Sequence, residues 1–353
     1  MTDRSGEIAA SIAAAAARRE ALYISGGGSK RQLLGRNCAG RELAVSGHTG
    51  ITDYQPSELV LTARAGTPLG EIVAALDREG QALPFEPPLF AGRATLGGTV
   101  ACNMSGPARP WAGSARDMVL GVQLLDGRGQ LLNFGGQVMK NVAGYDVSRL
   151  QAGALGTLGV LSQVSLKVLP RPEHSLTLVY DMEAGAAIDT MNRRSGQPCP
   201  LSGACWSDGR LYLRLSGAAA AVDHTAARWG GEKMAGDSDF WQNLREMTLP
   251  FFAGTDALWR LSVKSTAAPL DGSGPSLIDW GGAQRWLRGD LDPAQLQSWA
   301  ARAGGSATRF AGGDRCAQLR PMPDPVTRRL HERLKQAFDP HGILNPGRLY
   351  DFL

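Results

Sequence analysis

The stretch Ser25-Gly-Gly-Gly-Ser-Lys30, which follows a short apolar run at Leu22–Ser25, indicates how the first half of this chain folds. The apolar run predicts a strand, and the three glycines predict a tight loop whose consecutive N–H groups can form an anion-binding nest. Lys30 adds a positive charge, while Ser25 and Ser29 add hydroxyl donors. The spacing fits neither the G-x-x-x-x-G-K-[ST] loop nor the G-x-G-x-x-G fingerprint. Taken alone, the stretch is equally typical of a flexible surface turn.

Two further glycine-rich segments share this character. Ala94-Thr-Leu-Gly-Gly98 continues through Asn103-Met-Ser-Gly106, and Gly153-Ala-Leu-Gly-Thr-Leu-Gly-Val160 leads into an apolar run. Glycine lets a ligand lie close against the backbone, although the segment from Ala94 is also typical of a pair of loops around a short helix, and the segment from Gly153 is a weak signal on its own. The 45 glycines in 353 residues, roughly 13% against an average near 7%, favour the first interpretation. Three such segments in one half of the chain predict a domain that wraps a phosphate-bearing cofactor.

Hydrophobic periodicity predicts mixed helices and strands up to residue 172. Residues 68–79 are predicted to form a helix with Thr67 as its N-cap and Pro68 at its first position. Residues 158–169 predict a strand because apolar and polar side chains alternate, and Pro170-Arg-Pro172 ends it. The other predicted elements are a helix at 7–22, a strand at 22–25 and a hairpin with strands at 118–125 and 130–134.

The pattern changes after this boundary. The order strand, helix, strand, strand, helix predicts a ferredoxin-like antiparallel sheet, with elements at 175–180, 184–194, 201–206, 210–215 and 217–229. Strands at 257–264, 276–289 and 306–311 and a helix at 293–303 would extend it. A last helix at 324–338 has Val326, Leu330, Leu334 and Phe338 on one face. The chain is therefore predicted to be α+β, with parts at 1–172, 173–322 and 323–353.

Composition excludes several functional classes. The net charge of +4, without a block of Lys or Arg, argues against nucleic-acid binding. No window approaches the roughly 20 apolar residues of a membrane span, and Ala13–Ala17 lies in an amphipathic helix rather than a signal peptide. The five cysteines form no C-x-x-C pair, which argues against zinc, iron–sulfur clusters and a disulfide framework. We therefore expect a protein of the reducing cytoplasm with no metal site.

A set of short motifs occurs in a fixed order: the three glycine-rich segments, Asp117-Met-Val-Leu-Gly121, Asp126-Gly127, Lys140, Gly144-Tyr-Asp-Val147 and Phe338-Asp-Pro-His-Gly-Ile-Leu-Asn-Pro-Gly-Arg348. In this order they resemble the FAD-binding domain of the vanillyl-alcohol oxidase/p-cresol methylhydroxylase (PCMH) superfamily. The last motif is similar to the closing motif of its D-2-hydroxyacid dehydrogenase branch. The short chain and Gly35-Arg36 are similar to the FAD-binding subunits of bacterial glycolate oxidase complexes. The match covers about residues 20–170 and 330–350.

The resemblance implies a PCMH-type FAD-binding domain of two α+β subdomains in residues 1–172. It also implies a smaller ferredoxin-like antiparallel cap domain in 173–322, and a C-terminal helix and tail in 323–353 that return to the FAD domain. Noncovalent FAD is expected, because Gly28 stands where some members attach the flavin through a histidine.

The implied FAD contacts divide by segment. Residues 25–30 would hold the pyrophosphate, residues 94–98 and 103–106 would line the flavin and ribityl side, and Asn345 with Arg348 would close the site. The residues expected to contact FAD are Ser25, Gly26, Gly27, Gly28, Ser29, Lys30, Thr95, Leu96, Gly97, Gly98, Asn103, Ser105, Gly106, Gly153, Gly156, Thr157, Gly159, Val160 and Asn345.

The sequence departs from the hydroxyacid dehydrogenase branch at Gly312-Gly-Asp-Arg-Cys-Ala-Gln-Leu-Arg-Pro321, which lacks the histidine and glutamate of that branch's metal and base site. No catalytic residue is therefore assigned. The first hypothesis is the FAD-binding subunit of a glycolate (2-hydroxy acid) dehydrogenase, with catalysis in a larger FAD-containing subunit and an iron–sulfur subunit as a further partner. This subunit would lie in the cytoplasm, and its partner subunits would hold it at the periphery of the inner membrane.

Two other functions stay open. A stand-alone FAD-dependent 2-hydroxy acid dehydrogenase would take its base from elsewhere, with His48, Tyr145, Arg260 and His341 as candidates. His341 could instead simply end the last helix, and Tyr145 could pack its loop. A non-catalytic FAD-binding assembly subunit is the remaining alternative. A scaffold that has lost flavin is disfavoured, because the glycines at 26–28 are intact.

Overall fold

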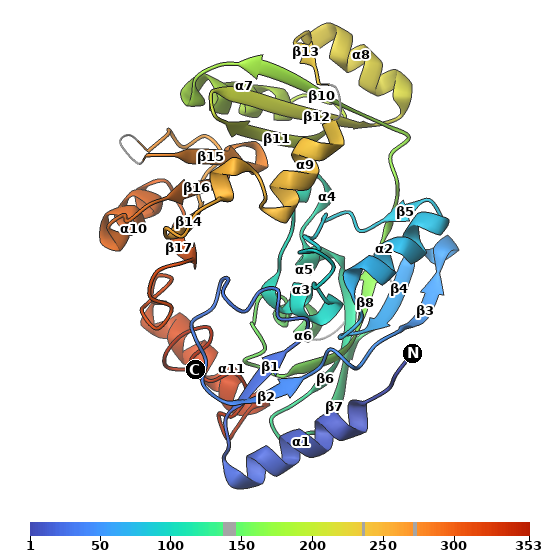
Figure 1. Ribbon diagram of the computed structural model, residues 1–353, viewed down its shortest axis with the longest axis vertical. Coiled ribbons are helices and arrows are strands. Elements are labelled where there is room, and N and C mark those ends of the chain that lie inside the picture. Colours follow the sequence, from blue (N-terminus) through green and yellow to red (C-terminus); the bar gives the residue numbers. More distant parts are fainter. Residues whose placement is uncertain (137–145, 235–236, 271–273) are drawn as a thin grey trace.

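The computed structural model describes residues 1–136, 146–234, 237–270 and 274–353. The motif residues Lys140, Gly144 and Tyr145 lie outside these described residues. Two lobes follow one another along the long axis of the molecule (Figure 1). The first lobe contains the elements up to β9 (Leu169–Pro170) and is rejoined by the end of the chain, and the second contains β10 (His174–Asp181) to β17 (Ser306–Ala311).

An antiparallel sheet in the order β3-β4-β8-β6-β7 organises the described part of the first lobe. Its strands are β3 (Ile51–Gln55), β4 (Val60–Arg64), β6 (Val119–Leu125), β7 (Leu131–Gly135) and β8 (Val160–Lys167). The predicted hairpin is confirmed, because β6 pairs with β7 in antiparallel register. The alternation predicted for β8 is wrong, because both of its faces are covered and Ser162 and Ser165 are as buried as the apolar residues.

A smaller unit lies beside this sheet and carries the first glycine-rich segment. It consists of α1 (Ser5–Arg18) and the parallel strands β1 (Leu22–Ser25) and β2 (Arg41–Ala44). The predicted end of the first helix at residue 22 is wrong, because Arg19 has the left-handed backbone that stops α1 (φ 50°). β1 ends at Ser25, so the glycines begin where this short strand leaves the fold's core.

The helices of the first lobe are short and set the loops of the site. They are α2 (Leu69–Arg78), α3 (Leu96–Cys102), α4 (Arg109–Ala112), α5 (Ala115–Met118) and α6 (Val147–Leu150), and β5 (Gln81–Ala82) pairs with β9. Thr67 is not the N-cap of α2, because its hydroxyl accepts the N–H of Gly50 (2.9 Å) and Pro68 occupies the cap position. α3 is the short helix that the alternative interpretation of the second glycine-rich segment predicted, and the side chain of Thr95 caps it by accepting the N–H of Gly98.

The second lobe is one antiparallel sheet of eight strands within the described residues, in the order β13-β10-β12-β11-β15-β16-β14-β17. Its first half is β10, α7 (Ala184–Ser195), β11 (Leu201–Ser207), β12 (Arg210–Gly217), α8 (Ala219–Trp229) and β13 (Glu232–Lys233). This strand–helix–strand–strand–helix–strand order confirms the predicted ferredoxin-like sheet.

The second half repeats the same strand order. It contains β14 (Leu258–Ser262), β15 (Ser276–Asp279), β16 (Gln284–Arg288), α10 (Pro293–Arg302) and β17, and is preceded by α9 (Asp237–Glu246). Read from its outer edge the order is β17-β14-β16-β15, which matches β13-β10-β12-β11. The single strand predicted at 276–289 is wrong, because Gly281 and Gly282 turn the chain back with positive φ (64° and 103°).

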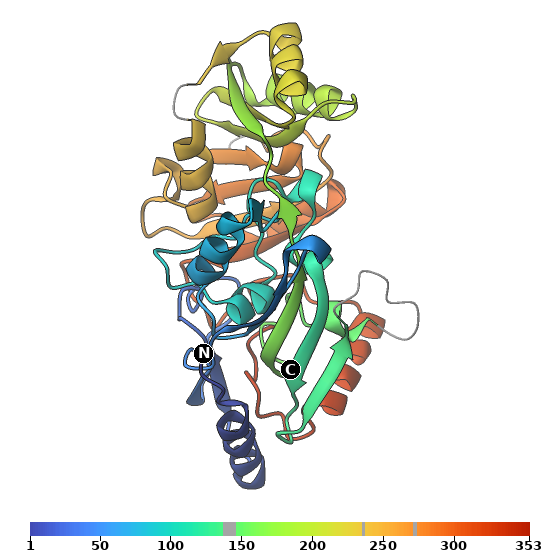
Figure 2. The ribbon, with the colours of Figure 1, turned by 90° about the vertical axis from the view of Figure 1, so that its right-hand side faces the viewer.

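The last helix, α11 (Pro325–Phe338), brings the chain back beside β7 of the first lobe (Figure 2). Its end is anchored by a buried ion pair between Lys335 and Asp339 (2.8 Å) and by the contact of Phe338 with Phe134. The apolar face predicted for this helix is covered only toward its end, since Leu330 is 53% exposed. The tail then pairs with β1 through backbone hydrogen bonds on both sides of Leu344.

Candidate functional site

A cavity of about 860 Å³, including its part open to solvent, lies in the first lobe where the three glycine-rich segments meet the tail. The sequence-predicted residues that line it are Ser25, Gly26, Gly27, Gly28, Ser29, Lys30, Thr95, Gly97, Gly98, Gly156, Gly159, Val160, Asn345 and Arg348. Segments 300 residues apart in the chain are thus brought to one site.

The glycines at 26, 27 and 97 are required by close packing of these segments on one another. A Cβ on Gly27 would collide with the carbonyl of Arg93, and a Cβ on Gly26 would collide with the hydroxyl of Thr95. A Cβ on Gly97 would lie 2.6 Å from the side chain of Ala65. The first two segments therefore pack backbone against backbone. Any larger residue at these positions would push them apart.

Three arginines hold the far side of the loop that follows the first segment. Arg348 donates to the carbonyls of Lys30 (3.3 Å), Arg31 (2.8 Å) and Arg36 (2.5 Å). Arg320 donates to the carbonyl of Leu34 (2.8 Å), and Arg315 donates to that of Gly35 (2.6 Å). These guanidiniums fix the loop from the C-terminal part of the chain. They also add positive charge beside the cavity, which favours an anionic ligand.

Lys30 is a buried cation at the cavity wall, with 7% of its surface exposed. Its ammonium donates to the hydroxyl of Ser29 (3.3 Å) and lies 5.4 Å from the ring centre of Phe90. Burial lowers the pKa of Lys30. No carboxylate of the described residues lies within ion-pair distance of it. The amide nitrogen of Gln151, also at the cavity and 2% exposed, has no hydrogen-bond partner in the described chain. Both groups are suited to a polar, anionic ligand.

Asn345 joins the tail to the third glycine-rich segment. Its side chain accepts the N–H of Ile24 (2.8 Å) and donates to the carbonyl of Leu155 (2.7 Å). Gly156 has positive φ (73°), and a Cβ there would lie 2.8 Å from the Asn345 amide. The closing motif thus completes one wall of the cavity by tying β1 to the segment at 153–160.

Six other sequence-predicted residues do not line this cavity. Leu96 and Thr157 are fully buried, and Asn103 ends α3 with left-handed backbone (φ 47°). Gly153 donates its N–H to the carbonyl of Val100. Ser105 and Gly106 line a second cavity instead.

The cavity also has lining residues that sequence reasoning missed: Tyr23, Ile24, Arg31, Val45, Ala65, Ala101, Cys102, Gln151, Leu155 and Leu161. Most are ordinary strand, helix or loop residues that carry no motif. Their position in the sequence was the one signal that could have identified them, because several of these residues directly flank a glycine-rich segment.

The second cavity, of about 420 Å³, lies between the lobes. It is lined from the second lobe by Arg260, Asp279 and Gln284 among others. The guanidinium of Arg260 has no hydrogen bond or ion pair to a described residue, and it lies 5.5 Å from the ring centre of Phe310. Burial and the neighbouring Arg320 lower the pKa of Arg260 to about 10. Arg260 is therefore a cation at neutral pH, which suits it to bind an anion rather than to act as a base.

Burial raises the pKa of Asp279 to about 7. Its carboxylate accepts the N–H of Trp280 (2.7 Å) and so stabilises the turn between β15 and β16. The Trp280 indole in turn donates to the carbonyl of Gly106 (3.0 Å). These contacts give Asp279 a structural role in docking the second lobe on the first.

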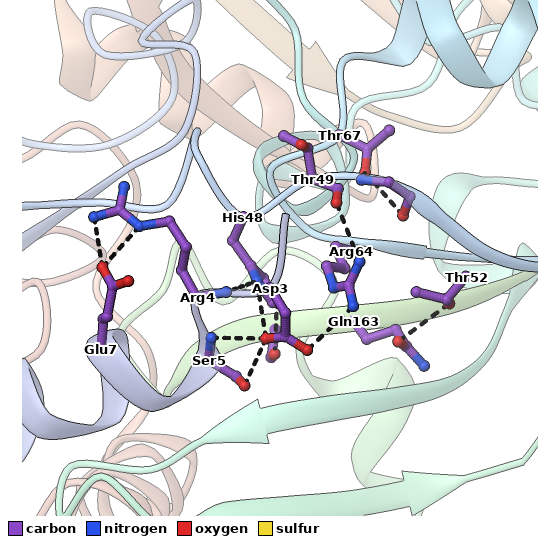
Figure 3. Close-up of polar contacts among 12 residues, drawn as sticks. Asp3, Arg4, Ser5, Glu7, His48, Thr49, Thr52, Arg64, Thr67 and Gln163 are labelled. Atoms are coloured by element: carbon purple, nitrogen blue, oxygen red, sulfur yellow. Dashed lines mark hydrogen bonds and ion pairs between the residues drawn. The ribbon is translucent and has the colours of Figure 1, made fainter. Parts of the chain in front are cut away.

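Two other candidate bases, His48 and His341, line neither cavity. His48 is buried, accepts the N–H of Arg4 (3.0 Å) and contacts the hydroxyl of Ser162 (3.0 Å), in a network that fastens the N-terminal residues (Figure 3). Burial lowers the pKa of His48, so its ring is neutral. His341 is exposed, and Tyr145 lies outside the described residues. The described residues also contain no cluster of metal ligands and no helix long and apolar enough to span a membrane.

Residues 3–135 match the family model described as an FAD binding domain, and residues 297–349 match the C-terminal domain of FAD linked oxidases. An alkyldihydroxyacetonephosphate synthase structure is similar to this fold, with a TM-score of 0.65 at 14% identity, covering 97% of this chain and 75% of that one. The chain belongs to the FAD-linked oxidase family. It is 49% identical to the glycolate oxidase subunit GlcE of Escherichia coli (strain K12), over 93% of this chain and 92% of that protein.

A shorter similarity, 30% identity, joins 43% of this chain to 33% of the glycolate oxidase subunit GlcD of Bacillus subtilis (strain 168). These findings confirm the resemblance drawn from the motifs, the α+β fold class with its PCMH-type FAD domain, and FAD as the cofactor.

Proposed function

We propose that this chain is the FAD-binding subunit of a complex that oxidises glycolate, or another small 2-hydroxy acid, to the 2-oxo acid. Relatives named as glycolate oxidase subunits support this substrate class. FAD, when bound, would supply the acceptor for the hydride of the alcohol carbon. The chain's own residues bind and orient the cofactor and hold the anionic end of the substrate.

The buried ammonium of Lys30 carries the cofactor part of the proposal. An unpaired buried cation is costly, and a pyrophosphate beside it would supply the missing negative charge. The glycine loop at 26–28 adds backbone N–H groups, and Gln151 offers an unpaired amide donor to a polar edge of the ring system. The fourteen sequence-predicted residues that line the first cavity are the proposed contacts, and FAD is proposed to be noncovalent.

Arg260 supports a carboxylate-bearing substrate. It is a cation without a counter-ion, and it faces the cavity between the lobes that Ser105 and Gly106 also line. A charge-assisted hydrogen bond from a guanidinium to a carboxylate contributes about 1.5–3 kcal/mol. The second cavity is thus the proposed place of the substrate's acid group.

Catalysis is proposed to need a partner subunit. No histidine of the described residues lines either cavity, and the one carboxylate that lines the second cavity is Asp279, which stabilises a turn. A larger FAD-containing subunit would supply the base, and an iron–sulfur subunit would carry electrons onward. The chain would lie in the cytoplasm, peripheral to the inner membrane through these partners. The proposed domain boundaries are residues 172 and 322.

Anaerobic reduction tests the proposal. The purified chain should be yellow and should release its flavin on acid or heat treatment. Addition of glycolate to the isolated chain should leave the flavin oxidised, whereas addition to the assembled complex should bleach it. A chain that stays colourless after reconstitution would refute FAD binding. Bleaching of the isolated chain by glycolate would favour the stand-alone dehydrogenase.

A further inference from the structure

Residues 89–93, just before the second glycine-rich segment, have a backbone that needs external support. Phe90 and Ala91 have positive φ (48° and 53°), a region that residues with a Cβ adopt at a cost of about 1–3 kcal/mol each. Such a conformation persists only where surrounding contacts hold it.

The support comes from the other lobe. Glu246, the last residue of α9, accepts the N–H of Phe90 (2.7 Å) with one carboxylate oxygen, and the N–H of Leu89 approaches both oxygens (3.0 and 3.1 Å). The Glu246 side chain is 15% exposed and is itself held by the guanidinium of Arg245 (2.9 Å). A carboxylate that accepts several backbone N–H groups is a strong anchor.

The anchored segment forms the back wall of the phosphate loop. The carbonyl of Arg93 occupies the space that a side chain on Gly27 would need. The ring of Phe90 lies beneath the ammonium of Lys30, 5.4 Å from its centre. A shift of residues 89–93 would therefore move both the glycine loop and the buried cation.

We propose that Glu246 is a positioning residue for FAD, through which the second lobe holds the phosphate loop of the first lobe in its binding geometry. This inference rests on the proposed FAD site. It assigns to α9 a role in cofactor affinity at a distance, without contact to the cofactor. Loss of the carboxylate would relax Phe90 and Ala91 and would loosen the loop at residues 25–30.

The test compares cofactor affinity in Glu246→Gln, Glu246→Asp and Arg214→Gln. Gln has the same shape but keeps a single acceptor oxygen and loses the negative charge, so its N–H₂ group replaces the oxygen that faces the N–H of Leu89, while Asp keeps the carboxylate. Arg214→Gln is the matched control, because it removes another ion pair between the lobes, with Glu86 (2.8 Å), and Arg214 makes no hydrogen bond to residues 89–93 in the described chain. The dissociation constants of FAD, by quenching of flavin fluorescence, and of ADP, by competition, are measured on each full-length apo chain.

Glu246→Gln should raise both dissociation constants by the same factor, about tenfold, because the change acts at the pyrophosphate that both ligands carry. Glu246→Asp should recover part of this loss, and Arg214→Gln should stay within about twofold of the wild type. Equal affinity in Glu246→Gln and wild type would overturn the inference, as would a loss for FAD alone or an equal loss in Arg214→Gln. A wild-type chain that binds neither ligand would instead overturn the proposed function, and this inference with it.

Discussion

Lys30→Met should weaken cofactor binding and at the same time stabilise the apo chain. Met keeps the length of the side chain and removes the ammonium. Lys30 is 7% exposed, and among the described residues its ammonium has one hydrogen bond of 3.3 Å and no carboxylate partner. Replacing a buried ion pair by apolar groups of similar volume is often neutral or stabilises proteins by about 1–4 kcal/mol, and Lys30 lacks even a paired anion in the described chain. The contact with Ser29 offsets part of this, so we expect a gain near the low end, about 1 kcal/mol.

The expected loss of FAD affinity follows from the removal of the same positive charge. A charge-assisted hydrogen bond to a phosphate contributes about 1.5–3 kcal/mol, which corresponds to an increase of about 10- to 100-fold in the dissociation constant of FAD. Flavin fluorescence titration measures this loss, and urea unfolding of the apo chain at pH 7.5 measures the gain in stability. Lys264→Met, at an exposed position, is the control and should change neither quantity appreciably.

The pH dependence of the apo chain's stability tests independently whether the charge on Lys30 stabilises or destabilises the fold. Burial lowers the pKa of Lys30 from the ordinary 10.5, so the unfolded chain binds more protons than the folded one in the range between the two values. The penalty is fully present below the folded pKa, and wild-type apo stability should rise relative to Lys30→Met as the pH approaches 10.5. A Lys30→Met variant that is less stable by more than about 1 kcal/mol and binds FAD as the wild type does would refute this reasoning.

Three shorter predictions concern the rest of the fold. Gly27→Ala should abolish flavin retention in the purified protein, because its Cβ collides with a backbone carbonyl, whereas Gly70→Ala, with open space around it, should retain flavin. His48 is held neutral with a lowered pKa, so stability should fall as the pH drops below 6.5; urea midpoints at pH 5 and 7.5 should differ more in wild type than in His48→Gln. Leu330→Ser should change the free energy of unfolding by less than about 0.5 kcal/mol because the side chain is exposed. Leu344→Ala, at a fully buried position, should cost about 2–5 kcal/mol in the same urea assay.

Hydrophobic periodicity in the sequence predicted those helices and strands whose apolar residues recur at regular spacing and face the core. α7 was expected at 184–194 and runs to Ser195, because its apolar residues at helical spacing face one side of the second-lobe sheet. The turn at Gly281 and Gly282 was missed because apolar residues continue on both sides of it. α3 was predicted only as an alternative because two of its seven residues are glycines, and it depends on the cap at Thr95 and on packing rather than on helix propensity.

The lining of the first cavity was predictable where it consists of glycine residues. Glycines at 26–28 and 97–98 carried a signal because they clear space, and they line the cavity. Leu96 and Thr157 stand in the same motifs but point into the core, since neighbouring residues of a turn or helix face different ways. Ala65 and Cys102 line the cavity without any signal, because what matters there is their small size and not their chemistry.

The repeat within the second lobe has a mechanical consequence. The two halves of the long sheet meet where β11 and β15 pair over two residue positions in the described chain, Trp206 with Ile278 and Ser207 with Leu277. β10 and β12, by contrast, pair over eight. The first half also packs α7 and α8 over one apolar cluster, and the second half packs α10 over another. Few backbone hydrogen bonds thus join the two halves, and a load across the sheet would also have to separate the apolar cluster that α9 forms with Cys205 and Leu277.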